Sequence, residues 1–339
     1  MKYLSIVLIA VGTIFFSCKK GTASPDNTPP TNLTVIALVN TDNSGNVSFT
    51  AAASNAISYE YDFGNGFVQT VASGVVTYKY PASGTYTVNV IAKSAGGQTI
   101  TKSIQVTVTV VLLLIWSDEF NTDGVPDATK WGYDIGGNGW GNNELEYYTN
   151  RTDNAIISNG TLKIIAKKEN FGGSAYTSAR ILTKDKFSFK YGKIEARAKL
   201  PAGIGTWPAI WMLGNNISTV SWPACGEIDI MEHVGSQLNK IYGTLHHPGH
   251  SGGNGDGSNV TISTATTEFH KYTLEWSGFT IKFLVDDVSF YIFTNNGSLP
   301  FNQNFFIILN VAMGGNFAGP VDPSFSNAAM EIDYIRVYN

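Results

Sequence analysis

Residues 32–109 form a series of short runs in which apolar and polar side chains alternate. The runs include residues 47–51, 58–63 and 85–92, and turn residues separate them. Alternation with a period of two places the apolar side chains on one face of a β-strand. Several short strands at this spacing are typical of a small β-sandwich. We therefore predict a β-sandwich domain over residues 32–110.

Strand patterns also dominate the rest of the chain, and no long amphipathic helix is expected there. Clear examples are residues 162–166, 187–200, 272–276, 280–285 and 305–311. Roughly 230 residues of strands in one unit favour a large sandwich of two antiparallel sheets, which bend. The sequence thus predicts an all-β protein whose second domain, residues 112–339, offers a concave face long enough for an extended polysaccharide.

Composition supports this architecture. The 339 residues are enough for about two domains. With 26 acidic and 22 basic residues, a net charge of −4 and no basic patch, the chain is not expected to bind nucleic acid. Charged residues make up 14%, aromatic residues 12%, and there are 35 glycines, which suits a secreted all-β protein and not a disordered one.

The first 18 residues have the pattern of a secretory signal peptide, with an apolar run over residues 3–16 that is followed by Ser17 and Cys18. This end resembles a bacterial lipobox, in which Cys18 becomes the lipidated first residue and the only membrane contact. Phe15 and Phe16 depart from the commonest lipobox, so an uncleaved anchor or simple secretion is the alternative. Residues 19–31 predict a flexible linker. We expect a cell-envelope lipoprotein on the periplasmic or surface face of the outer membrane, or a secreted protein.

Three carboxylates lie within six residues of a strand-forming segment: Glu227, Asp229 and Glu232. Side chains at i and i+2 of a strand share a face, so Glu227 and Asp229 face together while Ile228 packs behind them. Glu232 has the wrong parity for that face. One extra residue in the strand, a β-bulge near Met231, would restore it, and bulges recur beside active sites.

A solvated strand face is the plain alternative for these acidic residues. Coulomb repulsion among three carboxylates and the nearby tryptophans argue for a cleft instead. Indole faces stack on sugar rings, although buried Trp is also ordinary core material. We expect Trp207 in the core, and Trp211 and Trp222 in the cleft. Two glutamates that meet across a cleft are the standard machinery for cutting a glycosidic bond, and this is the chemistry that the motif favours.

Two pieces of the first domain, residues 61–66 and 78–88, resemble the polycystic-kidney-disease (PKD) type of immunoglobulin-like domain. The signature normally has Trp at the position of Tyr61 and Asp at the position of Asn65. The resemblance implies a spacer or an accessory binding module of a secreted bacterial enzyme. This segment contains no catalytic cluster.

Residues 112–339 resemble glycoside hydrolase family 16, and within it the bacterial laminarinases, which are endo-β-1,3-glucanases. The active-site motif of that family, Glu-x-Asp-x-x-Glu, corresponds to Glu227, Asp229 and Glu232. Supporting segments follow in order along the chain: residues 140–149, 176–180, 192–197, 205–211 and 331–338. The resemblance implies a concanavalin-like β-jelly roll with a substrate cleft across its concave sheet.

The resemblance makes Glu227 the nucleophile and Glu232 the general acid/base, with Asp229 supporting the nucleophile by hydrogen bonding and charge. A retaining mechanism needs the two carboxyl groups about 5–5.5 Å apart. Four steps along a strand span roughly 13 Å, so long side chains on a curved, bulged strand must close the gap. Like charges this close raise one pKa and keep one carboxyl protonated near neutral pH, and the sequence does not say which one.

For sugar binding, the resemblance points to two stacking platforms and three hydrogen-bonding residues: Trp211, Trp222, Asn143, Arg180 and His246. A structural salt bridge is the alternative role of Arg180. The histidines at 246, 247 and 250 could also suggest zinc, but the segment lacks a clear third protein ligand on regular structure. We therefore expect His246 to be a cleft residue.

Family 16 enzymes often carry a structural Ca²⁺ on the convex side. The matching positions are Glu119, the backbone of Gly160 and Asp333. Oxygen ligands from distant segments suit calcium, which would fasten both ends of the domain. The alternative is that Glu119 and Asp333 are simple surface acids. Catalysis by two carboxyl groups implies no cofactor.

The sequence therefore predicts a monomeric, endo-acting retaining hydrolase of β-1,3-glucan such as laminarin, with mixed β-1,3/1,4-glucan as a possible further substrate. The first alternative is a family 16 hydrolase of a marine galactan, such as agarose, porphyran or carrageenan. A cleft that reads sulfate should carry extra Arg or Lys near the catalytic strand, and residues 205–260 contain only Lys240. The second alternative is a non-catalytic glucan-binding protein, but such relatives lose the catalytic glutamates that are present here.

Overall fold

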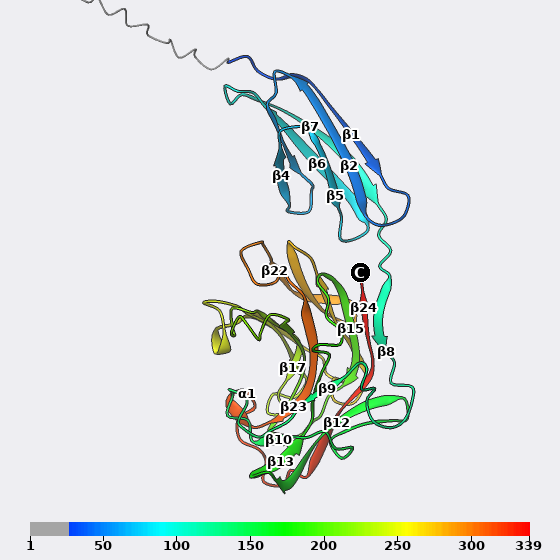
Figure 1. Cartoon of the computed structure of the whole chain (residues 1–339), viewed down its shortest axis with the longest axis vertical. Helices are drawn as coiled ribbons and strands as arrows, with labels where there is room; N and C mark the ends of the chain where they lie inside the picture. The colour runs from blue at the N-terminus through cyan, green and yellow to red at the C-terminus, as the bar shows by residue number, and fades with distance from the viewer. Residues whose placement is uncertain (1–26) are drawn as a thin grey trace, which may run out of the picture. The chain divides into compact units, whose positions relative to one another are not determined.

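A computed structural model describes residues 27–339, which fall into two compact units (Figure 1). Within the described residues, the first unit comprises residues 27–39, 47–78 and 85–107, and the second comprises residues 40–46, 79–84 and 108–339. The predicted signal peptide, Cys18 and most of the predicted linker lie outside the described residues. No helix among residues 27–339 is long and apolar enough to cross a membrane.

The first unit consists of two small sheets. One has the order β1 (Thr31–Val39), β2 (Asn46–Ser54), β5 (Val75–Lys79); the other has the order β4 (Val68–Val71), β3 (Ser58–Asp62), β6 (Gly84–Lys93), β7 (Thr99–Val108). The predicted alternation sends Phe49 and Tyr61 into the interior, where both side chains are fully buried. The Tyr61 hydroxyl donates a hydrogen bond to the carbonyl of Gly74 at 2.5 Å, so this phenol is buried without leaving its polar end unpaired.

The second unit is built from two large sheets. One runs β10-β13-β12-β24-β15-β20-β21-β22, with β11 beside β12 and β8 beside β24. Its strands are β8 (Leu114–Asp118), β10 (Glu146–Tyr148), β11 (Ala155–Ser158), β12 (Thr161–Phe171), β13 (Ser174–Ser178), β15 (Gly192–Lys199), β20 (His270–Trp276), β21 (Thr280–Val285), β22 (Val288–Thr294) and β24 (Asn327–Tyr338).

The other sheet, which is called the inner sheet below, runs β19-β18-β17-β16-β23-β14-β9. Its strands are β9 (Gly132–Asp134), β14 (Arg180–Leu182), β16 (Thr206–Gly214), β17 (Glu227–His233), β18 (Lys240–His246), β19 (Asp256–Thr261) and β23 (Phe305–Met313). A single apolar core lies between the sheets, because side chains from both of them form one buried cluster. The predicted all-β sandwich is thereby confirmed for the described residues.

The strand β23 lies inside the inner sheet and is buried along its whole length. Phe305, Ile307 and Leu309 enter the main core, whereas Phe306 and Ile308 face the opposite side. On that opposite side they pack with Cys225, which is a fully buried free thiol. A small apolar cluster therefore covers one end of the inner sheet on the side that faces away from the main core. The polar side chains of that side lie on the rest of it.

Candidate active site

The three carboxylates lie on β17, and the bulge that the sequence predicts is present. On one side Trp211 pairs with Asp229 but Ile210 pairs with Met231, so Ile230 is the extra residue. On the other side the register of β18 shifts between Asp229 and Glu232 in the same way. Because of this extra residue, Glu232 leaves the core face and joins Glu227 and Asp229 on the open face.

Neighbouring strands hold these carboxylates with specific contacts. His246 on β18 places Nε2 3.2 Å from Asp229 Oδ2 and 3.8 Å from Glu227 Oε1. Trp207 on β16 donates its indole N–H to Glu232 Oε1 at 2.9 Å. The hydroxyl of Thr244 donates to the other oxygen of Glu232 at 3.4 Å. Each of the two glutamates thus has a separate set of polar neighbours.

Burial dominates the electrostatics of this cluster. It raises the pKa of Glu227 well above the usual range, and the neighbouring carboxylate of Asp229 raises it further. It also raises the pKa of Asp229, with Glu232 as the next contribution. The pKa of Glu232 is raised by burial as well, while its hydrogen bond from Trp207 acts in the opposite direction. Burial and the repulsion among the three carboxylates thus act in one direction and favour a protonated carboxyl group, which is what a general acid requires.

Aromatic side chains lie beside the carboxylates. Trp222 is 43% exposed, and its ring centroid is 5.9 Å from that of His246. Trp211 is half-buried and donates its indole N–H to Asn310 Oδ1 at 2.8 Å. The structure therefore leaves Trp222 the more accessible of the two predicted platforms.

Arg180 is held more tightly than the sequence indicates. Its Nε lies 3.0 Å from Asp134 Oδ2, which is the structural salt bridge that was the alternative for this residue. Its guanidinium also lies between two indole rings, 4.9 Å from the centroid of Trp140 and 4.8 Å from that of Trp211. A cation held over aromatic rings in this way suits arginine better than lysine.

Asn143 lies in the loop before β10 and is exposed. Its amide donates to Asn316 Oδ1 at 2.9 Å, and Asn316 belongs to the short helix α1 (Gly315–Ala318). The contact joins this loop to α1, and within residues 27–339 no hydrogen bond or ion pair joins Asn143 to the carboxylate cluster.

Two features of the site were missed by the sequence analysis. Trp207 was expected in the core, but its indole binds Glu232. Trp207 is four residues from Trp211 on the same strand, and side chains at an even spacing along a strand share a face, so the sequence could have placed both indoles on one face. The second missed feature is a buried polar chain beneath Trp211, in which Asn310 donates to the Tyr148 hydroxyl at 3.0 Å, and Tyr148 donates to Glu144 at 2.9 Å. The polar residues of the segment 140–149 were its only sequence signal.

The predicted calcium ligands have other partners in this structure. Both oxygens of Glu119 accept hydrogen bonds from Arg336, at 3.0 and 2.7 Å. Asp333 forms an ion pair with Arg197. Gly160 occupies the turn between β11 and β12. A cation would have to displace two arginines to use these carboxylates, so the arrangement does not favour the predicted site, which stays a prediction.

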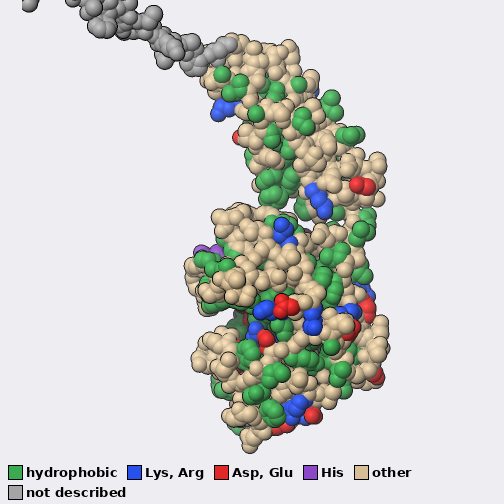
Figure 2. Space-filling view, in the orientation of Figure 1, with side chains coloured by type: hydrophobic (Ala, Val, Ile, Leu, Met, Phe, Trp, Pro, Cys, Tyr) green, Lys and Arg blue, Asp and Glu red, His purple; other side chains and the backbone are tan. Residues whose placement is uncertain are grey.

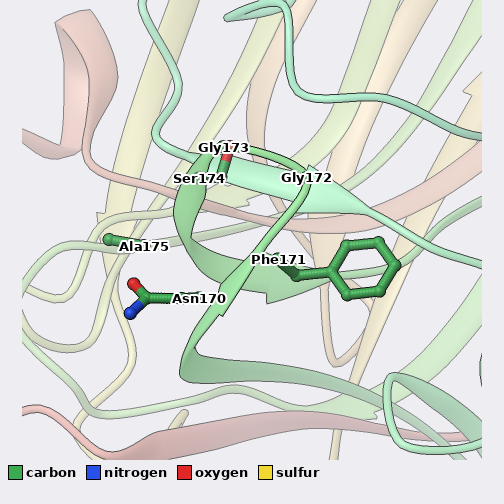
Figure 3. A pocket seen from close by; sticks show the side chains of 6 residues that line it. All are labelled: Asn170, Phe171, Gly172, Gly173, Ser174 and Ala175. Atoms are coloured by element: carbon green, nitrogen blue, oxygen red, sulfur yellow. The ribbon is translucent and has the colours of Figure 1, made fainter.

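Figure 2 shows that the second unit is hollowed on one side, with apolar and charged side chains visible inside the hollow. A separate shallow pocket lies at the hairpin between β12 and β13 (Figure 3). It is lined by residues 170–175, with Phe171 pointing away from Asn170 and Ala175. None of its lining residues belongs to the carboxylate cluster, so we exclude this pocket as the site of chemistry.

Known proteins resemble the region that carries the cluster. The profile described as "Glycosyl hydrolases family 16" matches residues 142–336, which include all three carboxylates. A second profile, "Beta-glucan synthesis-associated protein SKN1/KRE6/Sbg1", matches residues 51–227 and ends before Asp229. Among individual proteins, the Beta-glucanase of Rhodothermus marinus is 46% identical over 241 residues, which are 66% of this chain and 84% of the relative.

Solved structures give the same result. The laminarinase from Rhodothermus marinus matches with a TM-score of 0.65 and 45% identity, and the match covers 68% of this chain and 98% of that one. A LamA variant from Z. galactanivorans, in complex with laminaritriose and laminaritetraose, matches with a TM-score of 0.63 and 41% identity, covering 67% and 98%. The second unit therefore shares the jelly-roll fold of these enzymes, and the chain belongs to glycosyl hydrolase family 16.

Proposed function

We propose that this glycoside hydrolase is an endo-acting, retaining hydrolase of β-1,3-glucan such as laminarin. The observation that carries the proposal is the bulged strand β17, which gathers Glu227, Asp229 and Glu232 on one buried polar face. The similarity to laminarinases, one of them solved with laminarin-type oligosaccharides, supports the choice of substrate. The carboxyl pair needs no cofactor for this reaction.

In the proposed mechanism, Glu227 attacks the anomeric carbon while Glu232 donates its proton to the glycosidic oxygen, which leaves with one half of the chain. The bond from the anomeric carbon to that oxygen breaks, and a covalent glycosyl ester forms on Glu227. Glu232, now a carboxylate, then takes a proton from water, whose oxygen displaces Glu227. Asp229 lies within 4.8 Å of Glu227 and 3.2 Å from His246, where it supports the nucleophile by hydrogen bonding and charge. The product retains the β configuration, because inversion occurs twice.

The tryptophans supply apolar surfaces for sugar rings in this proposal. Trp222 is the exposed platform beside His246, and Trp211 is oriented by Asn310. Arg180, fixed between two indoles, and His246 offer hydrogen-bond donors to sugar hydroxyls. Asn143, which is held by its contact with Asn316 of α1, is the remaining candidate for a hydrogen bond to the sugar.

Mixed β-1,3/1,4-glucan is included as a further substrate. A marine galactan is not favoured, because residues 205–260 carry only Lys240 as a basic side chain to read sulfate. A non-catalytic glucan-binding protein is not favoured either, since both glutamates are present.

The deciding experiment measures the release of reducing ends from laminarin, lichenan, agarose and carrageenan by the purified chain. We expect short oligosaccharides from laminarin, a first product in the β configuration by NMR, and no turnover by Glu227→Gln. Activity only on a galactan would overturn the assignment of β-1,3-glucan as the substrate. An α first product would overturn the retaining mechanism, because an inverting enzyme needs a different separation of the carboxyl groups.

For the remaining parts of the chain, we propose a PKD-like accessory module in the first unit, supported by its two small sheets and by residues 61–66. We also propose a lipid anchor on Cys18 in the cell envelope and a monomeric state. Radiolabelled palmitate incorporation that disappears in Cys18→Ser, and light scattering of the mature chain, test these two points. A structural calcium would show as a melting temperature that falls in chelator.

A further inference from the structure

Two histidines and an aspartate outside the carboxylate cluster converge at the end of β18. His247 Nε2 lies 2.9 Å from Asp256 Oδ2, and His250 Nδ1 lies 3.0 Å from Asp256 Oδ1. One ligand atom from each of the three side chains lies within 4.8 Å of the other two. Asp256 is the third protein ligand that the sequence analysis could not identify, because it is nine residues from His247 and returns on a different strand.

We propose that His247, His250 and Asp256 form a binding site for zinc or a similar divalent transition metal. Around a four-coordinate zinc ion with bonds of about 2.0–2.1 Å, neighbouring ligand atoms lie about 3.3 Å apart. The two observed imidazole–carboxylate separations, 2.9 and 3.0 Å, are within a few tenths of an ångström of that value, and all three ligand atoms lie within 4.8 Å of one another. Two imidazoles and one carboxylate favour zinc over calcium, which prefers oxygen ligands only.

The fold holds these ligands in place before any metal binds. The backbone N–H groups of His247 and His250 each donate to the other's carbonyl, at 2.8 and 2.9 Å, and this closes the turn between them. The two imidazole rings stack at 4.7 Å with an angle of 19° between their planes. Asp256 begins β19, where it is paired in register with Leu245 of β18.

The surroundings also suit a metal with one open coordination position. His247 is buried, with its ring 5.7 Å from that of Phe301 and 6.0 Å from that of Phe293. The side chain of His250 is 49% exposed. One side of the site is therefore rigid and apolar, and the other side is open to solvent, so an ion can enter and a water molecule can complete the coordination.

The site adjoins the active site through Gly255, the residue before Asp256. A Cβ atom at Gly255 would lie 2.7 Å from both Cε1 and Nδ1 of His246, so the backbone there lies directly against that imidazole. His246 in turn approaches Asp229 at 3.2 Å. A metal that joins both ends of the loop 247–256 would hold Gly255 against His246 and so fix the position of that ring.

The test is zinc binding to the chelator-treated, tag-free chain, measured by calorimetry and by metal analysis after dialysis. We expect one zinc per chain, and a loss of affinity of more than about 100-fold in His250→Ala and in Asp256→Asn, since even outer partners of a metal site are worth 10–100-fold. Because His250 is half-exposed, His250→Ala should fold normally, which an unchanged melting temperature in chelator verifies.

Two controls separate this site from other histidine sites. His270→Ala removes an imidazole that pairs with a single aspartate, Asp286, and should leave zinc binding unchanged. Glu227→Gln alters the other His–carboxylate group, Glu227, Asp229 and His246, and should leave it unchanged too. Zinc should also slow hydrogen exchange in residues 249–257 of the wild type but not of His250→Ala. Equal zinc binding by the wild type and His250→Ala, or its loss in Glu227→Gln, would overturn the proposal.

Discussion

The indole N–H of Trp207 donates a hydrogen bond to Glu232 Oε1 at 2.9 Å. The same indole ring packs edge-on against Phe317, with 5.4 Å between the ring centroids, and this contact helps to fix the position of the indole N–H. Burial raises the pKa of Glu232, and the bond from Trp207 lowers it. The contact thus adjusts the acidity of the carboxyl group that we propose as the general acid/base.

Replacing Trp207 with Phe should keep the ring contact and remove the donor. We expect the basic limb of the pH profile of kcat/KM to move to higher pH, because the protonated form of Glu232 becomes more favourable. At the optimum, kcat/KM should fall about tenfold, since a hydrogen bond to a charged group is worth about 1.5–3 kcal/mol. An unmoved basic limb with wild-type turnover would mean that Trp207 only fills space.

Azide rescue distinguishes the two proposed glutamate roles. In Glu227→Ala, azide should enter the space of the nucleophile and yield a glycosyl azide of α configuration from an activated β-glucoside. In Glu232→Ala, the glycosyl ester still forms from an aryl glucoside, and azide should then yield the β product. Unrescued turnover should fall by several orders of magnitude in both variants. The opposite pattern of products, read by NMR, would exchange the roles of the two residues.

The sequence predicts most of the site but not the parts that depend on register between distant strands. The alternation of side chains along β17 was enough to predict the bulge, because the mismatch between Glu232 and the face of Glu227 is visible within that one strand. The bond from Trp207 to Glu232 depends on the pairing of β16 with β17, and Asp256 depends on the pairing of β18 with β19. Such pairings are set by the packing of both sheets on one core, so they cannot be predicted from the sequence of a single segment.

Trp222 should act as a sugar platform with little effect on stability. Its side chain is 43% exposed, so Trp222→Ala should change the free energy of unfolding by less than about 0.5 kcal/mol. KM for laminarin should rise about two- to tenfold with kcat nearly unchanged, because stacking on an aromatic face is worth about 0.5–1.5 kcal/mol. Phe171→Ala is the matched control, since Phe171 is 38% exposed but lies in the hairpin pocket. Equal effects of the two substitutions on KM would contradict the platform role.

Glu146 should make the stability of the second unit depend on pH. It is fully buried; one carboxyl oxygen accepts the backbone N–H of Met313 at 2.6 Å, and the other has no hydrogen-bond partner among residues 27–339. Burial raises the pKa of Glu146 well above the usual range, and Glu144 raises it further. Because the folded-state pKa lies above the unfolded one, the favourable contribution is present below the unfolded pKa and is lost as the pH rises through the folded value.

The variant Glu146→Gln stays neutral at every pH and can still accept the Met313 N–H. The melting temperature of this variant should therefore equal that of the wild type near pH 4.5 and exceed it increasingly towards pH 8. The corresponding difference in the free energy of unfolding should be about 1–3 kcal/mol, the cost of a buried polar group without a partner. Glu169→Gln is a control of opposite sign, because hydrogen bonds from Thr177 and Arg151 lower the pKa of Glu169. That variant should lose stability relative to the wild type at neutral pH and regain parity in acid. If the melting temperatures of Glu146→Gln and the wild type ran parallel from pH 4.5 to 8, the pKa of Glu146 would be the same in the folded and unfolded states, which contradicts a pKa raised by burial.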